Sequence, residues 1–298
     1  MVALCRRGSD TRFLEQHGCA LVEGDVRDES KSLAQGMAGC SHVVHSAALV
    51  YADSAWSKVR AVNVEGTRNV LSAAVTSGAV HATHISSVAV YGIDLGVTDG
   101  SDSADSDLPP GDLYARSKRE AEAVSRGIEE KRGLPITVVR PSAVYGERDR
   151  LLIPALLGVL RRRWVPRLGP AHNTLPVVYA GNVASAIVLA VEASLGHETF
   201  DLGLDHPLTQ RALLEGLAAG AGLRPRFIDV PAGLVRGTAW LLSRMGVTIP
   251  GAKTVPLNRV VRLALGDNPY PSKRVREELG WDPPYAHSEA LLRSAQGA

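Results

Sequence analysis

Short apolar runs alternate with helical patterns through the first two-thirds of the chain. The apolar runs predict strands at Val2–Leu4, Ala20–Glu23, His42–Ser46, His81–Ser86 and Ile136–Arg140. Stretches of helical pattern lie between them, at Thr11–Gln16, Lys31–Met37, Ala55–Ser77 and Asp112–Lys131. Because strands and helices that alternate at this spacing form parallel sheets covered by helices, the pattern predicts an α/β fold with a doubly wound parallel sheet.

Beyond residue 150 the alternation loosens, and helical patterns joined by Pro/Gly turns dominate. They lie at Leu151–Arg161, Val183–Glu192, Arg211–Ala218, Leu234–Arg244, Asn258–Leu265, Ser272–Leu279 and Ser288–Arg293, with short strands at Val177–Tyr179 and Thr199–Asp201. We therefore expect a sheet domain at 1–150, to which 172–204 contribute, and a smaller, mostly helical lobe at 151–298. The acidic, Ser/Gly/Pro-rich segment Asp94–Pro110 is expected to be a surface loop near the site.

The composition excludes several classes of function. Of the 298 residues, 45% are hydrophobic and 21% are charged, and a net charge of +2 gives no sign of nucleic-acid binding. The apolar stretches are too short or too interrupted to span a membrane, and Arg6 and Arg7 precede any run that could form a signal peptide. The three dispersed cysteines indicate reduced thiols, and the histidine pairs lack the neighbours of a metal site. We expect a cytoplasmic protein without a metal.

Tyr114 and Lys118 are the most informative pair in the sequence. Residues at i and i+4 share one face of a helix, so the ammonium lies near the phenol and lowers its pKa from about 10. Ser86 and Ser87 end the strand that precedes this helix. A phenol with a lowered pKa beside a strand-end hydroxyl is typical of reversible carbonyl reduction, in which one group moves a proton while a nicotinamide moves the hydride.

With these residues in place, the chain resembles the extended short-chain dehydrogenase/reductase superfamily (the NAD-dependent epimerase/dehydratase superfamily) almost from end to end. The matching segments are Glu23–Val26, Val43–Ala48, Asn63–Thr67, the set Ser87, Tyr114 and Lys118, Arg140–Gly146, Val177–Ala184 and Ser272–Trp281. Tyr114–Glu122, with the pattern Tyr-x-x-Ser-Lys-x-x-Ala-Glu, and Pro269–Trp281 favour one branch. That branch holds the 3β-hydroxysteroid-dehydrogenase-like, dihydroflavonol-reductase-like and 3-oxoacid-reductase-like members. The resemblance implies a Rossmann-type NAD(P)-binding domain and a smaller substrate lobe.

The resemblance also implies roles for individual residues. Tyr114 would transfer the hydroxyl proton, Lys118 would hold the nicotinamide ribose, and Ser87 would hydrogen-bond the substrate oxygen. Ser86 would point to the opposite face of its strand, so Ser87 is the preferred catalyst. The implied cofactor-binding residues are Arg6, Arg7, Asp25, Val26, Ala47, Ala48, Tyr114, Lys118, Pro141 and Val144. Asn63 would steady either the helix or a water in the proton path, or make a plain helix-to-backbone contact.

The choice of cofactor depends on the end of the strand Val2–Leu4. Relatives that use NAD place an acidic residue there, which binds the ribose hydroxyls. This chain has Arg6 and Arg7 and no acid before Asp10. Since Arg suits a 2′-phosphate better than a bare ribose, we expect NADP, with NAD as the alternative.

The glycine-rich turn that binds the pyrophosphate in these relatives is missing from the sequence. In the family a strand, a Gly-x-x-Gly-x-x-Gly turn and a helix come before the strand matched by Val2–Leu4, and that first strand lies in the middle of the sheet. Its loss would leave two inner strand edges unpaired. Three explanations stay open: Met1 is a misassigned start, the chain is an inactive fragment, or another segment or chain fills the gap.

Three functions are therefore considered. The first is an NAD(P)-dependent oxidoreductase that interconverts a hydroxyl and a ketone on a bulky, largely apolar small molecule. The second is a nucleotide-sugar epimerase or dehydratase, in which Arg161–Arg163, Arg167 and Asn173 would bind a diphosphate. The third is a truncated pseudoenzyme without cofactor. Family members commonly pair through the helices that correspond to Ala55–Ser77 and Asp112–Lys131, so a homodimer is expected in addition.

Overall fold

The computed structural model describes residues 1–50, 55–92, 108, 111–169, 171–244, 261, 265–268 and 270–297. The chain divides into two compact units. Unit 1 comprises the described parts of 1–92, 104–139 and 189–199, and unit 2 those of 93–103, 140–188 and 200–298. The loop expected at Asp94–Pro110 and the helix expected at Asn258–Leu265 lie outside the described residues, apart from single positions.

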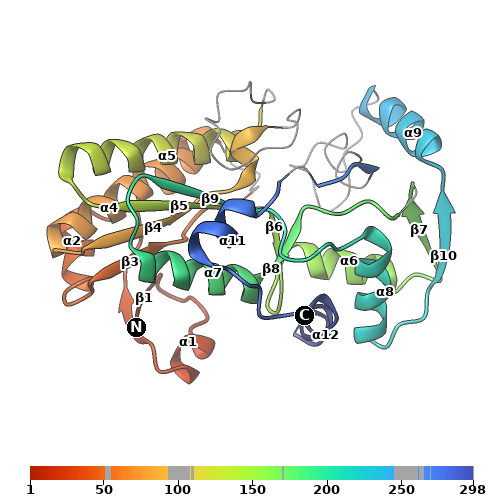
Figure 1. The fold of residues 1–298 in the computed structure, drawn as a ribbon, viewed down its shortest axis with the longest axis horizontal. Coiled ribbons are helices and arrows are strands. Elements are labelled where there is room, and N and C mark those ends of the chain that lie inside the picture. The colour runs from red at the N-terminus through yellow and green to blue at the C-terminus, as the bar shows by residue number, and fades with distance from the viewer. Residues whose placement is uncertain are drawn as a thin grey trace. The chain divides into compact units, whose positions relative to one another are not determined.

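The strands of the first two-thirds form parallel ladders, which confirms the predicted α/β class (Figure 1). β1 (Val2–Cys5) pairs with β2 (Ala20–Glu23). A second sheet has the order β3 (His42–His45), β4 (His81–Ile85), β5 (Ile136–Pro141), β9 (Glu198–Leu202). β3, β4 and β5 are parallel, and β5 and β9 each run from one unit into the other.

The two ladders of unit 1 are not hydrogen-bonded to each other within the described residues. β1 pairs only with β2 there, and β3 only with β4, so each keeps one edge outside its ladder. Val2, Leu4 and Val44 on these two strands are exposed.

Helices α2 (Ser30–Gly36), α4 (Gly66–Ser77) and α5 (Leu113–Arg132) lie side by side on the sheet of unit 1 (Figure 1). The remaining helices of this unit are α1 (Arg12–Gln16), α3 (Trp56–Arg60), the π-helical turn η1 (Ala61–Glu65) and the 3₁₀ turn η2 (Val88–Tyr91). The predicted helix Ala55–Ser77 is thus continuous but contains a π turn. Asp112 caps α5 by accepting a hydrogen bond from the Ala115 amide, and Gly133 ends it with a positive φ of 72°.

The core of unit 1 fills the space between these helices and the strands. Leu71, Ala73, Ala82 and Ile136 are among its fully buried members. Small residues on α4 let the helix approach its neighbours closely, because a Cβ at Gly66 would lie 2.8 Å from the Val26 side chain.

Unit 2 contains more strand than the sequence indicated. β6 (Ala143–Tyr145) pairs in parallel with β8 (Val177–Tyr179), and β7 (Trp164–Leu168) with β10 (Arg226–Val230). The expectation of a mostly helical lobe missed β6, β7 and β10, since β6 has only three residues and the other two are short runs that contain or adjoin arginines. The domain boundary at 150 stays a prediction; the two contact-defined units meet at Val139–Arg140.

The described helices of unit 2 are α6 (Leu152–Leu160), α8 (Gln210–Gly220), α9 (Ala232–Arg244), α11 (Lys273–Leu279), α12 (His287–Gln296) and the start of α7 (Ala180–Ala193), which continues into unit 1. Three of them, α6, α8 and α12, contribute residues to a second apolar core. Tyr145, Ile153, Leu208 and Leu217 are at most 1% exposed in this core. None of the helices in the described parts of the chain has the length and apolar character needed to cross a membrane.

Candidate functional site

The candidate site lies in unit 1, where the end of β4 meets the first turns of α5. β4 leads directly into Ser86 and Ser87, and α5 carries Tyr114 and Lys118 one turn apart. Ser87 is half-buried and caps η2, since its Oγ accepts a hydrogen bond from the Ala89 amide at 3.2 Å. Ser86 is buried and turned away, because its Oγ donates to Glu122 Oε1 at 2.5 Å.

Lys118 joins the two elements. Its Nζ donates a 2.7 Å hydrogen bond to the Ile85 carbonyl at the end of β4 and lies 6.0 Å from the centroid of the Tyr114 ring. Only 4% of the residue is exposed. Burial lowers the pKa of Lys118 to about 8, and the charge of Glu122 opposes that shift. The ammonium thus lies next to the strand end that carries Ser87 and the phenol that would move a proton.

Two buried histidines, His45 and His84, lie close enough to Lys118 for its charge to act on them. His45 on β3 stacks on His84 on β4, with ring centroids 5.7 Å apart. His45 Nε2 lies 2.9 Å from Thr67 Oγ1, and His84 Nδ1 lies 2.7 Å from Ser125 Oγ. Burial, reinforced by the charge of Lys118, lowers the pKa of His45 to about 3 and that of His84 well below its usual value. Both imidazoles are therefore neutral at physiological pH. Sequence reasoning placed them only at strand ends.

Asn63 connects η1 to the segment after β3. It is buried, its Oδ1 accepts from the Leu49 amide at 2.7 Å, and its Nδ2 donates to the Leu49 carbonyl at 3.0 Å and to Ser117 Oγ at 2.8 Å. Of the alternatives left open by the sequence, these contacts favour the helix-to-backbone contact. They fix the chain just after Ala47 and Ala48, of which Ala47 is exposed and Ala48 half-buried.

Arg6, Arg7 and Asp25 lie at the ends of β1 and β2. Arg6 and Arg7 are exposed. Asp25 makes a bidentate ion pair with Arg27, at 2.8 and 3.0 Å, which lowers the pKa of Asp25 to about 2. Val26 packs in the core against Gly66. Arg6 and Arg7 follow the last residue of β1, whereas the side chain of Val26 is part of the core of unit 1.

Pro141 and Val144 belong to unit 2. Pro141 is buried at the end of β5, and Val144 is 41% exposed on β6. Their expected role at the cofactor stays a prediction. Within the part of the chain that the structure describes, no group of three His, Cys, Asp or Glu side chains could hold a metal ion.

The residues fit part of a nicotinamide dinucleotide. The buried ammonium of Lys118 suits ribose hydroxyls, the small Ala47 and Ala48 permit close approach, and the exposed Arg6 and Arg7 suit a phosphate. The described residues contain no Gly-x-x-Gly-x-x-Gly turn between a strand and a helix for the pyrophosphate. The described residues therefore offer contacts for the two ends of such a cofactor but no such turn for its pyrophosphate.

The chain is similar to known dehydrogenases, reductases and epimerases. Residues 7–199 match the profile of the 3-beta hydroxysteroid dehydrogenase/isomerase family. The chain is 28% identical over 295 residues to 3beta-hydroxysteroid-dehydrogenase/decarboxylase isoform 2 of Arabidopsis thaliana, a match that covers 92% of this chain but 51% of that protein. It therefore spans about half the length of this relative.

Two further relatives match over most of their own length. A 4-hydroxy-2-methyl-3-oxo-4-farnesyl-3,4-dihydroquinoline-1-oxide ketoreductase of Stigmatella aurantiaca is 27% identical, with 98% of this chain and 88% of that protein covered. N-acetyl-alpha-D-glucosaminyl-diphospho-ditrans,octacis-undecaprenol 4-epimerase of Escherichia coli O157:H7 is 30% identical, with 92% and 82% covered.

A solved structure shows the same fold. UDP-glucose 4-epimerase of Thermotoga maritima superimposes with a TM-score of 0.72 at 18% identity, covering 99% of this chain and 89% of that one. At this identity the likeness concerns the fold alone.

Proposed function

We propose, because the chain belongs to the 3-beta hydroxysteroid dehydrogenase/isomerase family, that it interconverts a hydroxyl and a ketone on a bulky, largely apolar small molecule. The observation that carries the proposal is the position of Lys118, which is bonded to the strand end before Ser87 and lies one turn after Tyr114. A bound nicotinamide nucleotide would supply or accept the hydride.

Each residue of the set contributes one part of the proton chemistry. Tyr114 donates its phenolic proton to the carbonyl oxygen in reduction and takes it back in oxidation. Lys118 favours the phenolate that remains, because a cation close to the ring stabilises the charged form. Ser87, held at the start of η2, donates a hydrogen bond to the same oxygen and so fixes its position.

α9 of unit 2 carries an exposed apolar face. Leu234, Trp240 and Leu241 are more than half exposed there, whereas Val235 packs inward. In contrast, Ile153, Leu157 and Leu160 of α6 are buried in the core of unit 2. The relatives named as acting on a steroid and on a farnesylated quinoline support an apolar substrate class.

The test is turnover by the purified chain with NADPH or NADH and two substrate panels. One panel holds steroid ketones and other bulky apolar ketones, and the other holds nucleotide sugars. Reduction of apolar ketones supports the proposal, and turnover confined to nucleotide sugars contradicts it.

A nucleotide-sugar epimerase is the second candidate, favoured by the 30% identity to the epimerase of Escherichia coli O157:H7. Two of the residues expected to bind a diphosphate already have partners within the protein. Arg167 is buried and bonded to Asp229 at 2.7 and 3.0 Å and to Glu215 at 2.8 Å. Asn173 donates to the Gly266 carbonyl. A diphosphate would therefore rely on Arg161–Arg163.

NADP is the proposed form of the cofactor, with NAD as the alternative. Replacing Arg6 by Ala is expected to weaken NADPH binding about 10- to 100-fold and to leave NADH binding nearly unchanged. The reason is that a hydrogen bond to a charged group contributes about 1.5–3 kcal/mol, and every 1.4 kcal/mol is about tenfold in affinity. Titration calorimetry with both nucleotides measures this. Arg12→Ala is the control, since Arg12 is exposed and paired with Asp10; equal losses in both variants would contradict the assignment.

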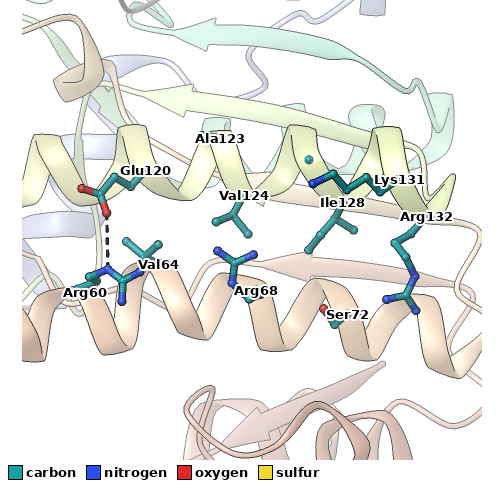
Figure 2. A pocket seen from close by; sticks show the side chains of 11 residues that line it. Arg60, Val64, Arg68, Ser72, Glu120, Ala123, Val124, Ile128, Lys131 and Arg132 are labelled. Atoms are coloured by element: carbon teal, nitrogen blue, oxygen red, sulfur yellow. Dashed lines mark ion pairs between the residues drawn. The ribbon is translucent and has the colours of Figure 1, made fainter.

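A homodimer through α3–α4 and α5 is also proposed. A groove of about 520 Å³ runs between these helices, with buried Val64, Val124 and Ile128 beneath it and Arg68, Lys131 and Arg132 along it (Figure 2). On the α5 side of the groove, Ala123 and Gly127 have small or no side chains and so leave space. Nothing lies within 4 Å of a Cβ built at Gly127. A partner helix would find both apolar surface and space there.

Gly127→Arg is expected to convert a dimer into a monomer without lowering the temperature of unfolding. The new side chain has room in the monomer, and replacing a helical glycine stabilises the helix by about 0.5–1 kcal/mol. Light scattering after size-exclusion chromatography gives the mass. Gly158→Arg on α6, where a Cβ also meets nothing within 4 Å, is the matched control. A Gly127→Arg protein that stays dimeric would contradict this interface.

The state of the cysteines is relevant to the cellular location of the protein. Cys5, Cys19 and Cys40 are all free thiols. Free thiols are typical of reducing compartments, which supports the proposed cytoplasmic location.

A further inference from the structure

Glu122 is a buried carboxylate for which the proton chemistry described above has no use. It lies one turn after Lys118 on α5 and is 0% exposed. Its Oε1 accepts the 2.5 Å hydrogen bond from Ser86, and its Oε2 lies 3.6 Å from Arg126 Nη1. A buried carboxylate is stable only when it is paired or hydrogen-bonded, and these two contacts hold that of Glu122 inside unit 1.

The groups around Lys118 show what the carboxylate does. α5 contributes Tyr114 and Glu122, β4 contributes His84 and the Ile85 carbonyl, and β3 contributes His45. The two histidines are neutral, and each is disfavoured in its charged form by Lys118. Among the described residues, Glu122 is the carboxylate whose charge acts on Lys118.

We propose that the side chain of Glu122, held in place by Ser86, is a positioning residue that keeps Lys118 charged at the end of β4. The inference rests on the proposed oxidoreductase function, since a charged Lys118 matters there for the phenolate of Tyr114. The two neighbouring serines then have different roles. Ser86 holds the buried carboxylate of Glu122, and Ser87 hydrogen-bonds the reacting oxygen in the proposed function.

The physical reason is a balance between two opposing effects. Burial lowers the pKa of Lys118 from 10.5 to about 8, which is close to neutral pH, and Glu122 acts against this shift. Without the carboxylate charge the pKa falls further, so that a larger fraction of Lys118 is neutral at pH 7.5. A neutral Lys118 no longer stabilises the phenolate.

The first experiment follows Lys118 itself and needs neither cofactor nor substrate. The chain has six lysines, so the lysine ε-carbon signals of ¹³C-labelled protein can be resolved by NMR, and the signal absent from Lys118→Arg identifies Lys118. Glu122→Gln keeps the shape and an oxygen for Ser86 but removes the charge. We expect it to lower the titration midpoint of Lys118 by about 1 pH unit or more. An unchanged midpoint in a folded Glu122→Gln protein overturns the proposal.

Two further variants separate charge from shape. Ser86→Ala removes the hydrogen bond and keeps the charge, so a smaller shift is expected. Glu122→Asp keeps the charge but withdraws it by one methylene group, and a shift between those of wild type and Gln is expected. If Glu122→Gln does not fold, this pair decides: midpoints equal to wild type in both variants overturn the proposal.

The second experiment is the pH profile of ketone reduction. Glu122→Gln is expected to move the alkaline limit of kcat toward lower pH with little change in KM, whereas a merely structural role would lower activity equally at every pH. Suppose that the wild-type chain shows no activity but that Glu122→Gln still lowers the titration midpoint of Lys118. This result refutes the proposed function and supports the electrostatic role of Glu122. An active wild type with an unchanged profile and midpoint in Glu122→Gln refutes the role of Glu122 alone.

Discussion

Tyr114→Phe is expected to lower kcat for ketone reduction by about 100- to 10,000-fold, the usual contribution of a positioned general acid. The phenyl ring keeps the shape of the side chain but has no proton to give to the carbonyl oxygen. Substrate and cofactor affinities should change little, because Lys118 keeps its bond to the Ile85 carbonyl. Steady-state kinetics at several pH values, together with cofactor titration, measures both effects.

Tyr285→Phe is the matched control for this variant. It makes the same chemical change on a half-buried tyrosine of unit 2, whose ring packs edge-on against Tyr179. Its activity should stay within about twofold of wild type, as for a substitution that touches no reacting group. More than a tenth of wild-type kcat in Tyr114→Phe would show that another group supplies the proton.

Acidification is expected to destabilise the folded chain steeply below pH 6.5. In the folded state burial lowers the pKa of His45 to about 3 and that of His84 well below 6.5, so neither takes up a proton. In the unfolded chain both titrate near 6.5. Above this pH the two states bind equal numbers of protons at these sites. Below it the unfolded chain binds more, so the free energy of unfolding falls as the pH falls toward the folded-state values.

The expected size of this loss is a large part of the total stability. Each histidine contributes about 1.4 kcal/mol per pH unit, so the pair removes about 4 kcal/mol by pH 5. A whole domain has only about 5–15 kcal/mol. Urea unfolding at pH 7.5, 6 and 5 measures the slope. Replacing His45 by Gln should remove about half of the slope that the two histidines cause. A slope equal to that of wild type would contradict the assignment.

The parts of the site that depend on local spacing could be predicted from the sequence. Tyr114 and Lys118 share a helix face wherever that helix packs, and Ser87 follows an apolar run that forms β4. The strands β1 to β5 agree with their predicted positions to within one or two residues, because each is a short apolar run between clear turn signals.

The parts that depend on packing between distant segments could not be predicted. The bond from Ser86 to Glu122 links residues 36 positions apart, and the stacked His45 and His84 lie on neighbouring strands. The sequence shows that these side chains exist but not that burial makes the histidines neutral. The pattern from Tyr114 to Glu122 was the one available signal for Glu122, and it indicated a branch of the family without a role for the residue.

The π turn η1 changes what the helix that spans α3 and α4 can contact. A π turn holds one residue more than an α turn, which offsets the two helical segments by about 100° around the axis. Trp56 on α3 can therefore lie under the Arg116 guanidinium at 4.0 Å, while Gly66 on α4 packs against Val26. The rotational phase of each segment is set by its own neighbour, so a substitution that reshapes the α3 surface does not have to disturb the packing of α4 beneath the site.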